Sequence, residues 1–174
     1  MKKFIVIFSA VVLLISISGI KTNAQEIKLG GGLVFETDRP PVGLQFKGTY
    51  GLDMLLENLS GSVEFGLFFP KTTTNWKYTR WGIDIDGNWT FFNTGNFNFY
   101  AIGGLNITHY SEKYTGPSSP YYDYNDDIGT KPGLNMGAGI NLNFSSSMSA
   151  FSEVKYIISN YDEAVFNLGV LFAL

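Results

Sequence analysis

The sequence predicts an all-β fold: an eight-stranded antiparallel up-and-down transmembrane β-barrel, preceded by a cleaved signal peptide. Three observations lead to this prediction. The chain of 174 residues begins with a short basic stretch and an uncharged apolar run. Eight later segments alternate apolar and polar residues with a period of two, which is the pattern of β-strands. Only 16% of the residues are charged and 45% are hydrophobic, whereas a typical soluble domain has about 25% charged residues.

The N-terminal run has the organisation of a secretory signal peptide. The chain starts Met-Lys-Lys and continues with the apolar residues 4–20. Cleavage is expected after Ala24, with Thr22 at the −3 position. We therefore expect a signal peptide over residues 1–24 and an outer-membrane β-barrel domain over residues 25–174. A retained membrane anchor is the alternative.

The first four strands are expected at residues 26–36, 42–50, 61–69 and about 80–91. The fourth contains the stretch WGIDIDGNW, in which Ile83 and Ile85 share one face while Asp84 and Asp86 share the other. The apolar faces of these strands carry Ile27, Leu29, Leu33, Phe35, Leu44, Phe46, Tyr50, Val63, Phe65, Leu67, Phe69, Trp81, Ile83, Ile85, Trp89 and Phe91.

The turn signal NTGN at residues 93–96 separates the fourth strand from the fifth. The remaining strands are expected at about residues 97–108, 133–144, 150–158 and 164–174. Tyr100 and Ile102 fall on the otherwise polar face of the fifth strand. No helical periodicity lies between the eight strands, so the sheet is expected to remove its edges by closing into a barrel.

Alternation alone does not say which face points outward. A soluble barrel of the lipocalin kind places its apolar face inside, whereas a membrane barrel places it outside. Here the polar face is poor in charge and rich in glycine and asparagine, which suits a narrow, crowded interior. Aromatic residues near the strand ends fit interfacial girdles: Trp81, Trp89, Phe91, Phe97, Phe99, Phe144 and Phe172. We therefore expect the apolar face to contact lipid, with a soluble carrier as the alternative.

The lengths of the connections support one orientation in the bilayer. With the N-terminus in the periplasm, the connections after the first, third, fifth and seventh strands lie outside the cell. The longest of these spans about residues 112–132. Two periplasmic connections are short, as outer-membrane barrels require. The remaining periplasmic connection, residues 51–60 after the second strand, is longer, and Met54 to Leu56 are expected to form an interfacial turn there.

The chain resembles small bacterial outer-membrane β-barrel proteins of the OmpX/OmpA-barrel type, and more narrowly the outer-membrane beta-barrel domain family common in Bacteroidetes. The resemblance rests on the Ala24–Gln25 junction, on FYAIGGLNITHY, and on FSEVKYIISNYDEAVFNLGVLF near the C-terminus. It departs from the usual aromatic last residue, because Leu174 ends the chain and Phe172 stands two residues earlier. The resemblance implies a location in the bacterial outer membrane, contact with lipid and lipopolysaccharide, and insertion by the barrel-assembly machinery. It says little about function, because this fold hosts many roles.

Charged residues on the polar face are expected to form a network in the lumen. They are Lys28, Glu36, Lys47, Glu64, Arg80, Asp84, Asp86, Glu153 and Lys155. The interior of an eight-stranded barrel is just wide enough to be filled by side chains. Buried ions there must pair, because an unpaired buried charge costs several kcal/mol. The predicted function is therefore a structural or surface-interaction role with a plugged lumen, and the alternative is a minor porin for water or small ions.

The long outer connection is the predicted surface for binding an extracellular protein or glycan. Its candidate contact residues are Tyr114, Tyr121, Tyr122, Asp123 and Tyr124. Tyrosine is favoured at recognition surfaces. The acids in DYNDD could hold Ca²⁺ through oxygen ligands, although they do not match the EF-hand spacing and an acidic, solvated loop is the alternative.

A third functional hypothesis concerns His109 and Ser111, which stand two residues apart and therefore on one strand face. The pair is similar to the His-x-Ser pair of outer-membrane lipid A deacylases, in which histidine activates serine. Glu112 follows the serine where that family usually has asparagine. A rim histidine near lipid headgroups is the alternative, and we predict no enzymatic activity.

The composition also excludes several other kinds of site and partner. The chain has no cysteine and a single histidine, so thiol chemistry and multi-histidine metal sites are excluded. We predict no cofactor and no metal. Lysine and arginine form no cluster, so nucleic acid is not an expected partner. We expect a monomer.

Overall fold

The computed structural model of the chain describes residues 27–37, 41–117, 125–160 and 162–174. The predicted signal peptide and its cleavage site lie outside these residues, so they stay predictions. Among the described residues, no helix is long and apolar enough to span a membrane. All the regular secondary structure in this part of the chain is β-strand.

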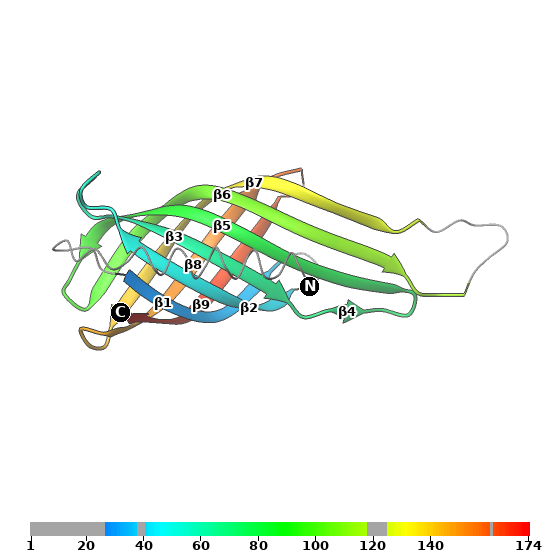
Figure 1. The fold of residues 1–174 in the computed structure, drawn as a ribbon, viewed down its shortest axis with the longest axis horizontal. Coiled ribbons are helices and arrows are strands. Elements are labelled where there is room, and N and C mark those ends of the chain that lie inside the picture. The colour runs from blue at the N-terminus through cyan, green and yellow to red at the C-terminus, as the bar shows by residue number, and fades with distance from the viewer. Residues whose placement is uncertain (1–26, 38–40, 118–124, 161) are drawn as a thin grey trace.

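Nine strands follow one another along the described chain (Figure 1). They are β1 (Ile27–Glu36), β2 (Val42–Gly51), β3 (Leu59–Phe68), β4 (Lys71–Thr72), β5 (Trp76–Asn93), β6 (Phe97–Tyr114), β7 (Asp127–Asn143), β8 (Met148–Ile158) and β9 (Glu163–Ala173). The eight predicted strands correspond to all of these except β4. That two-residue strand lies in the connection between β3 and β5 and pairs with Lys77 and Tyr78 of β5.

The strands close into an eight-stranded barrel. Consecutive strands pair antiparallel except β3 and β4; β3 pairs directly with β5, and β9 pairs with β1. The predicted all-β, up-and-down fold is therefore confirmed. Closure gives the strands within the barrel wall a hydrogen-bonded neighbour on both sides, which removes the free edges that an open sheet would expose.

The two faces of the sheet divide as the alternation predicts. The exposed outer face carries the aliphatic and aromatic residues, including all seven of the predicted girdle aromatics. The enclosed face carries mainly amides, hydroxyls and ionisable groups, together with fewer apolar side chains such as Val34, Phe151 and Leu171. Trp81 and Trp89 of β5 stand eight residues apart, about 26 Å along the strand at ~3.3 Å per residue. At the usual tilt, that distance accounts for most of the ~25 Å apolar band of a membrane barrel. The outer face is thus a lipid-facing surface.

Turns connect neighbouring strands at one end of the barrel, the end at which the C-terminus lies (Figure 1). In the predicted NTGN turn, Gly95 adopts φ 81°, a conformation that suits glycine, and its N–H donates to Asn93 Oδ1 at 2.7 Å. The predicted interfacial turn also forms: the N–H of Leu55 donates to the carbonyl of Leu52 at 2.8 Å. Met54 and Leu55 are exposed there.

At the opposite end, three strands extend well past the others and form a projecting sheet (Figure 1). β5 and β6 have 18 residues and β7 has 17, whereas β1, β2 and β3 have 10 each. The predicted ends of these strands, and the predicted loop over residues 112–132, were therefore wrong by several residues. Beyond the membrane neither face of the sheet contacts lipid chains, so the residues there need not alternate between apolar and polar. Pairing with a neighbouring strand extends these strands.

Candidate functional site

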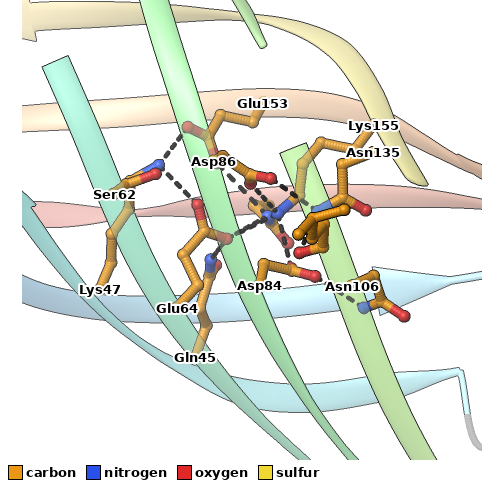
Figure 2. A network of polar contacts seen from close by, with 12 residues as sticks. Gln45, Lys47, Ser62, Glu64, Asp84, Asp86, Asn106, Asn135, Glu153 and Lys155 are labelled. Atoms are coloured by element: carbon orange, nitrogen blue, oxygen red, sulfur yellow. Dashed lines mark hydrogen bonds and ion pairs between the residues drawn. The ribbon is translucent and has the colours of Figure 1, made fainter. Parts of the chain in front are cut away.

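The centre of the lumen is organised around the ammonium group of Lys155 on β8 (Figure 2). Its Nζ lies 2.7 Å from Asp84 Oδ2, 2.8 Å from Glu64 Oε2 and 3.1 Å from Asp86 Oδ2. The side chain of Lys155 is 0% exposed. Oxygen atoms of these three carboxylates lie within 4.8 Å of one another, a spacing that could hold a metal ion. The lysine already contacts all three and acts as their common counterion.

A second lysine shares one of these acids. Lys47 Nζ lies 2.9 Å from Glu64 Oε1 and also pairs with Glu153. Tyr100, the predicted exception on the polar face of its strand, donates its hydroxyl to Glu153 Oε1 at 2.7 Å. Glu64 therefore joins both lysines, and the ionisable groups form one continuous cluster.

Strand register brings these groups together. Lys47 of β2 stands directly opposite Glu64 of β3, which stands opposite Asp84 of β5, which stands opposite Asn106 of β6. These four residues form a row along one wall of the barrel. Glu153 and Lys155 come from β8, which lies on the far side of the closed strand order. Their ion pairs with the row thus cross the lumen.

Four amide side chains complete this cluster. Asn106 Nδ2 donates to Asp84 Oδ1 at 2.6 Å, and Asn135 Nδ2 donates to Asp86 Oδ1 at 2.7 Å. Gln45 donates to Glu64, and Asn167 Nδ2 lies 3.4 Å from both Glu64 and Glu153. The predicted network omitted these residues because an amide carries no charge. Their positions on the enclosed faces of the strands were the available signal.

Arg80 lies nearer the projecting end and is the cation of a second group of ion-paired side chains. Its Nη1 lies 3.1 Å from Glu36 Oε2, and its Nη2 pairs with Glu163. The sequence predicts Arg80 within a single network and Glu163 in the last outer connection, but Glu163 begins β9. Phe68 lies under the guanidinium, with 5.4 Å between the guanidinium carbon and the ring centroid.

The two groups are connected by a chain of hydrogen bonds. Arg80 Nη2 donates to Thr108 Oγ1 at 3.4 Å, and Thr108 donates to Asn106 Oδ1 at 2.9 Å. Asn106 in turn donates to Asp84. The polar filling therefore runs from the middle of the barrel toward its projecting end.

A polar cavity of about 280 Å³ lies at the turn end of the lumen. Lys28, which was predicted to point inward, lines it together with Thr49, Asn58 and Asn98. Lys47 and Tyr100 also line it, so the cavity ends against the central cluster. Water can enter the barrel from this side as far as those two residues.

At the projecting end, only one of the predicted contact residues can be placed. Tyr114 packs edge-on against Trp76 with 5.3 Å between ring centroids. Its backbone N–H donates to Asp126 Oδ1 at 3.2 Å. Tyr121, Tyr122, Asp123 and Tyr124 lie outside the described residues.

His109 and Ser111 share the outer face of β6, as expected from their spacing. The His109 ring stacks on Trp81 with 5.3 Å between ring centroids, and its Nδ1 lies 3.0 Å from Thr130 Oγ1. The residues directly opposite His109 are Trp81 and Thr130. Those directly opposite Ser111 are Thr79 and Ile128. None of these four is acidic, so no directly opposed carboxylate orients the histidine.

Solved structures of outer-membrane barrels share this fold. A major outer membrane protein from Thermus thermophilus is 10% identical with a TM-score of 0.63, over 87% of this chain and 100% of that chain. The N-terminal β-barrel domain of Pseudomonas aeruginosa OprF is 17% identical with a TM-score of 0.59, over 88% and 98%. Ail, the attachment invasion locus protein of Yersinia pestis, is 12% identical with a TM-score of 0.58, over 86% and 97%.

At these identities the likeness concerns the fold alone, which is that of small outer-membrane barrels, as the sequence predicted. No family model matches the chain, and no curated protein matches it. The narrower resemblance to the Bacteroidetes family stays a prediction.

Proposed function

We propose that this chain is an integral protein of the bacterial outer membrane that contacts a partner outside the cell through its projecting sheet and outer connections. The lipid-facing outer surface and the fold shared with outer-membrane barrels support the location. In this proposal the lumen is a plug that makes the barrel rigid. The barrel then serves as a scaffold for the sheet that stands above the membrane.

The observation that carries the proposal is the free edge of the projecting sheet. β7 pairs with β6 from Asp127 to Leu142, but its pairing with β8 begins only at Leu134. Among the described residues, the segment 127–133 therefore has a strand neighbour on one side only. An exposed edge presents backbone donors and acceptors to which an extended segment of another protein can add.

Side chains on the projecting sheet suit such a contact. Trp76 and Tyr114 form an aromatic pair at its far end. Lys131 Nζ lies 4.0 Å from the ring centroid of Tyr110, which holds that ring in place. Aromatic anchors supply much of the binding energy at protein interfaces.

A trimmed barrel tests the proposal. Replacing residues 112–129 with a short Gly-Ser turn removes Tyr114 and the outer part of the edge, residues 127–129, and leaves the lipid-facing strands whole. The matched control replaces Ser145–Ser147, at the opposite end, with Gly-Ser residues. Cells displaying each barrel are then tested for adhesion to immobilised matrix proteins and to heparin. Loss of adhesion in the trimmed barrel alone supports the proposal, whereas equal adhesion of trimmed and intact barrels rules it out.

The second candidate is a minor porin, and the 280 Å³ cavity that opens the turn end as far as Lys47 favours it. In this case the central cluster acts as a gate whose ion pairs rearrange. Conductance of the refolded barrel in a planar bilayer, with a Glu64→Gln, Asp84→Asn variant beside it, separates the candidates. Steady channel openings of the wild type that the variant alters would support the porin. A folded wild-type barrel that shows no conductance would support the plug.

His109 and Ser111 have no catalytic role in this proposal. Their shared face toward the membrane rim is the sole support for a lipid A acyl-ester hydrolase. Expression of the barrel is expected to leave lipid A acylation unchanged. Loss of acyl chains that Ser111→Ala abolishes would establish the hydrolase instead.

A further inference from the structure

Two lysines stand directly opposite each other on the outward face of the projecting sheet. Lys77 of β5 pairs in register with Lys113 of β6, and both side chains are exposed. They continue the alternation of Trp81 and His109, so they lie on the face that meets lipid further along the barrel. Directly opposed side chains have Cβ atoms about 4.5–5.5 Å apart, and like charges in such positions destabilise a sheet.

No carboxylate compensates this pair among the residues that the structure describes. Within that part of the chain, neither lysine forms an ion pair. Two acids nearby, Glu112 and Asp127, stand opposite each other on the other face of the sheet. The carboxylate of Asp126 accepts the backbone N–H of Tyr114 at 3.2 Å. Opposed cations on a face without a paired acid suit an anion that comes from outside the chain.

Strand geometry brings the lysine pair to the level of lipid headgroups. Trp81 belongs to the aromatic girdle, and such girdles lie at the membrane–water interface. Lys77 stands four residues beyond it on β5, which is about 13 Å along the strand and about 10 Å in height at the usual tilt. The headgroup layer extends about 5–7 Å beyond the hydrocarbon core. A long lysine side chain can bend toward that layer, so both ammonium groups can reach it.

Hydroxyl groups lie on the same face between the lysines and the girdle. Thr79 and Ser111 stand directly opposite each other in the row nearer the membrane. In the following row, His109 stacks on Trp81 with 5.3 Å between ring centroids, and its Nδ1 lies 3.0 Å from Thr130 Oγ1. Hydroxyls can donate hydrogen bonds to phosphate oxygens. The spacing of His109 and Ser111 thus fits a surface of hydrogen-bonding groups at the rim of the barrel.

We propose that Lys77 and Lys113 bind the phosphate group of an outer-leaflet lipid, with Thr79 and Ser111 as hydrogen-bond donors beside them. A phosphate between the two ammonium groups replaces their repulsion with two charge-assisted contacts. A lipid is the favoured source of the phosphate, because the pair lies above the lipid-facing wall and not at the free edge of β7. The inference rests on the proposed function only in placing the projecting sheet outside the cell.

Two double variants with the same change in net charge separate this site from a general charge effect. The test variant is Lys77→Gln, Lys113→Gln. The matched control is Lys71→Gln, Lys131→Gln, which removes two lysines from the opposite face of the same sheet. Lys71 stands opposite Tyr78 on that face, and Lys131 lies there over the Tyr110 ring.

The experiment uses the full barrel refolded in a zwitterionic detergent without divalent cations. Lipid A with its phosphates, or the same lipid A after their removal, is titrated in, and barrel–lipid complexes are counted by native mass spectrometry. We expect the wild type and the control to bind phosphorylated lipid A in clear preference to the dephosphorylated form. The test variant should bind phosphorylated lipid A roughly thirtyfold more weakly, the loss expected for two lysines at an anionic membrane surface.

Four results would each overturn the proposal. Equal binding of both forms of lipid A by the wild type would show that the phosphate is not recognised. Equal losses in the test variant and the control would show that only net charge matters. Full displacement of lipid A by the same concentration of inorganic phosphate would show that the site takes a free anion. Loss of adhesion to heparin with unchanged binding of lipid A would assign the lysines to a sulfated glycan.

The outcome is separate from the test of the proposed function. The test variant keeps the free edge of β7, so its adhesion to matrix proteins should equal that of the intact barrel. A trimmed barrel that loses adhesion beside a test variant that still binds lipid A would support the proposed function and overturn this inference alone.

Discussion

Lys155 on β8 and Glu64 on β3 meet inside the barrel with 2.8 Å between Nζ and Oε2, although 91 residues separate them along the chain. β3 and β8 lie opposite each other in the closed strand order. The contact therefore braces the barrel across its width, and Lys47 extends it to Glu153 through the same carboxylate. We expect both the stability of the barrel and the closure of its lumen to depend on this brace.

Removal of the central lysine should destabilise the barrel strongly. Lys155→Met keeps the length of the side chain but leaves Glu64, Asp84 and Asp86 without their shared cation. Breaking a buried ion pair by removing one partner costs about 3–5 kcal/mol. Unfolding by guanidinium in lipid vesicles measures this loss, and the exposed Lys113→Met should change stability by less than about 0.5 kcal/mol. Equal stability of the two variants would mean that the ion pairs contribute nothing.

Truncation of the β8 side chains should open the lumen. Wild-type barrel is expected to show no steady conductance in a planar bilayer, because Glu153 and Lys155 are almost fully buried and fill its cross-section. The double variant Glu153→Ala, Lys155→Ala should conduct small ions. Val154→Ala, between them on the lipid-facing side, is the matched control and should stay silent. Steady wild-type openings would contradict the plug.

Alanine should lower the stability of the barrel at Gly104 but not at Gly103, its neighbour on β6. At Gly104 a Cβ would lie 2.2 Å from Asp86 Oδ1 and 2.3 Å from the Ile85 carbonyl oxygen, whereas at Gly103 it would meet nothing within 4 Å. Overpacking of this kind costs about 1–3 kcal/mol. Gly104→Ala should therefore lower the free energy of unfolding by that amount and Gly103→Ala should not. A larger loss for Gly103→Ala than for Gly104→Ala would show that β6 faces the other way.

Arginine substitutions on the outer surface should show where the bilayer lies along β5. Ile85 is 57% exposed and lies midway between Trp81 and Trp89 on β5, at the expected bilayer centre. An arginine at the midplane of a membrane barrel costs about 2–4 kcal/mol, falling to about 0–1 kcal/mol near the interface. Ile85→Arg should show the larger cost and Thr79→Arg, on the same face beyond Trp81, the smaller one. Folding into lipid vesicles measures both, and a reversed order would contradict this placement of the bilayer.

The interior residues show how far sequence reasoning reaches at the site. Alternation places Glu64, Asp84, Asp86 and Lys155 on the polar face, and the low charge and the many glycines and asparagines of that face predict that it points inward. Which acid meets which lysine does not follow, because it depends on strand register and on closure. Gln45 and Asn167 escaped prediction because an amide carries no charge, and Glu163 because it was placed in the last outer connection, whereas it begins β9.

The sequence by itself determined the strand pattern, the closed antiparallel topology, and which face meets lipid. Hydrophobic alternation gives the strands locally, and the composition of the two faces gives the side that meets lipid. A bilayer accepts only structures whose backbone hydrogen bonds are satisfied internally, which requires closure. The tertiary structure alone decided the lengths of β5, β6 and β7 beyond the membrane, the ion pairs across the lumen, and the polar cavity beside them. These features depend on pairing and packing between distant strands, and no periodicity within a single strand records them.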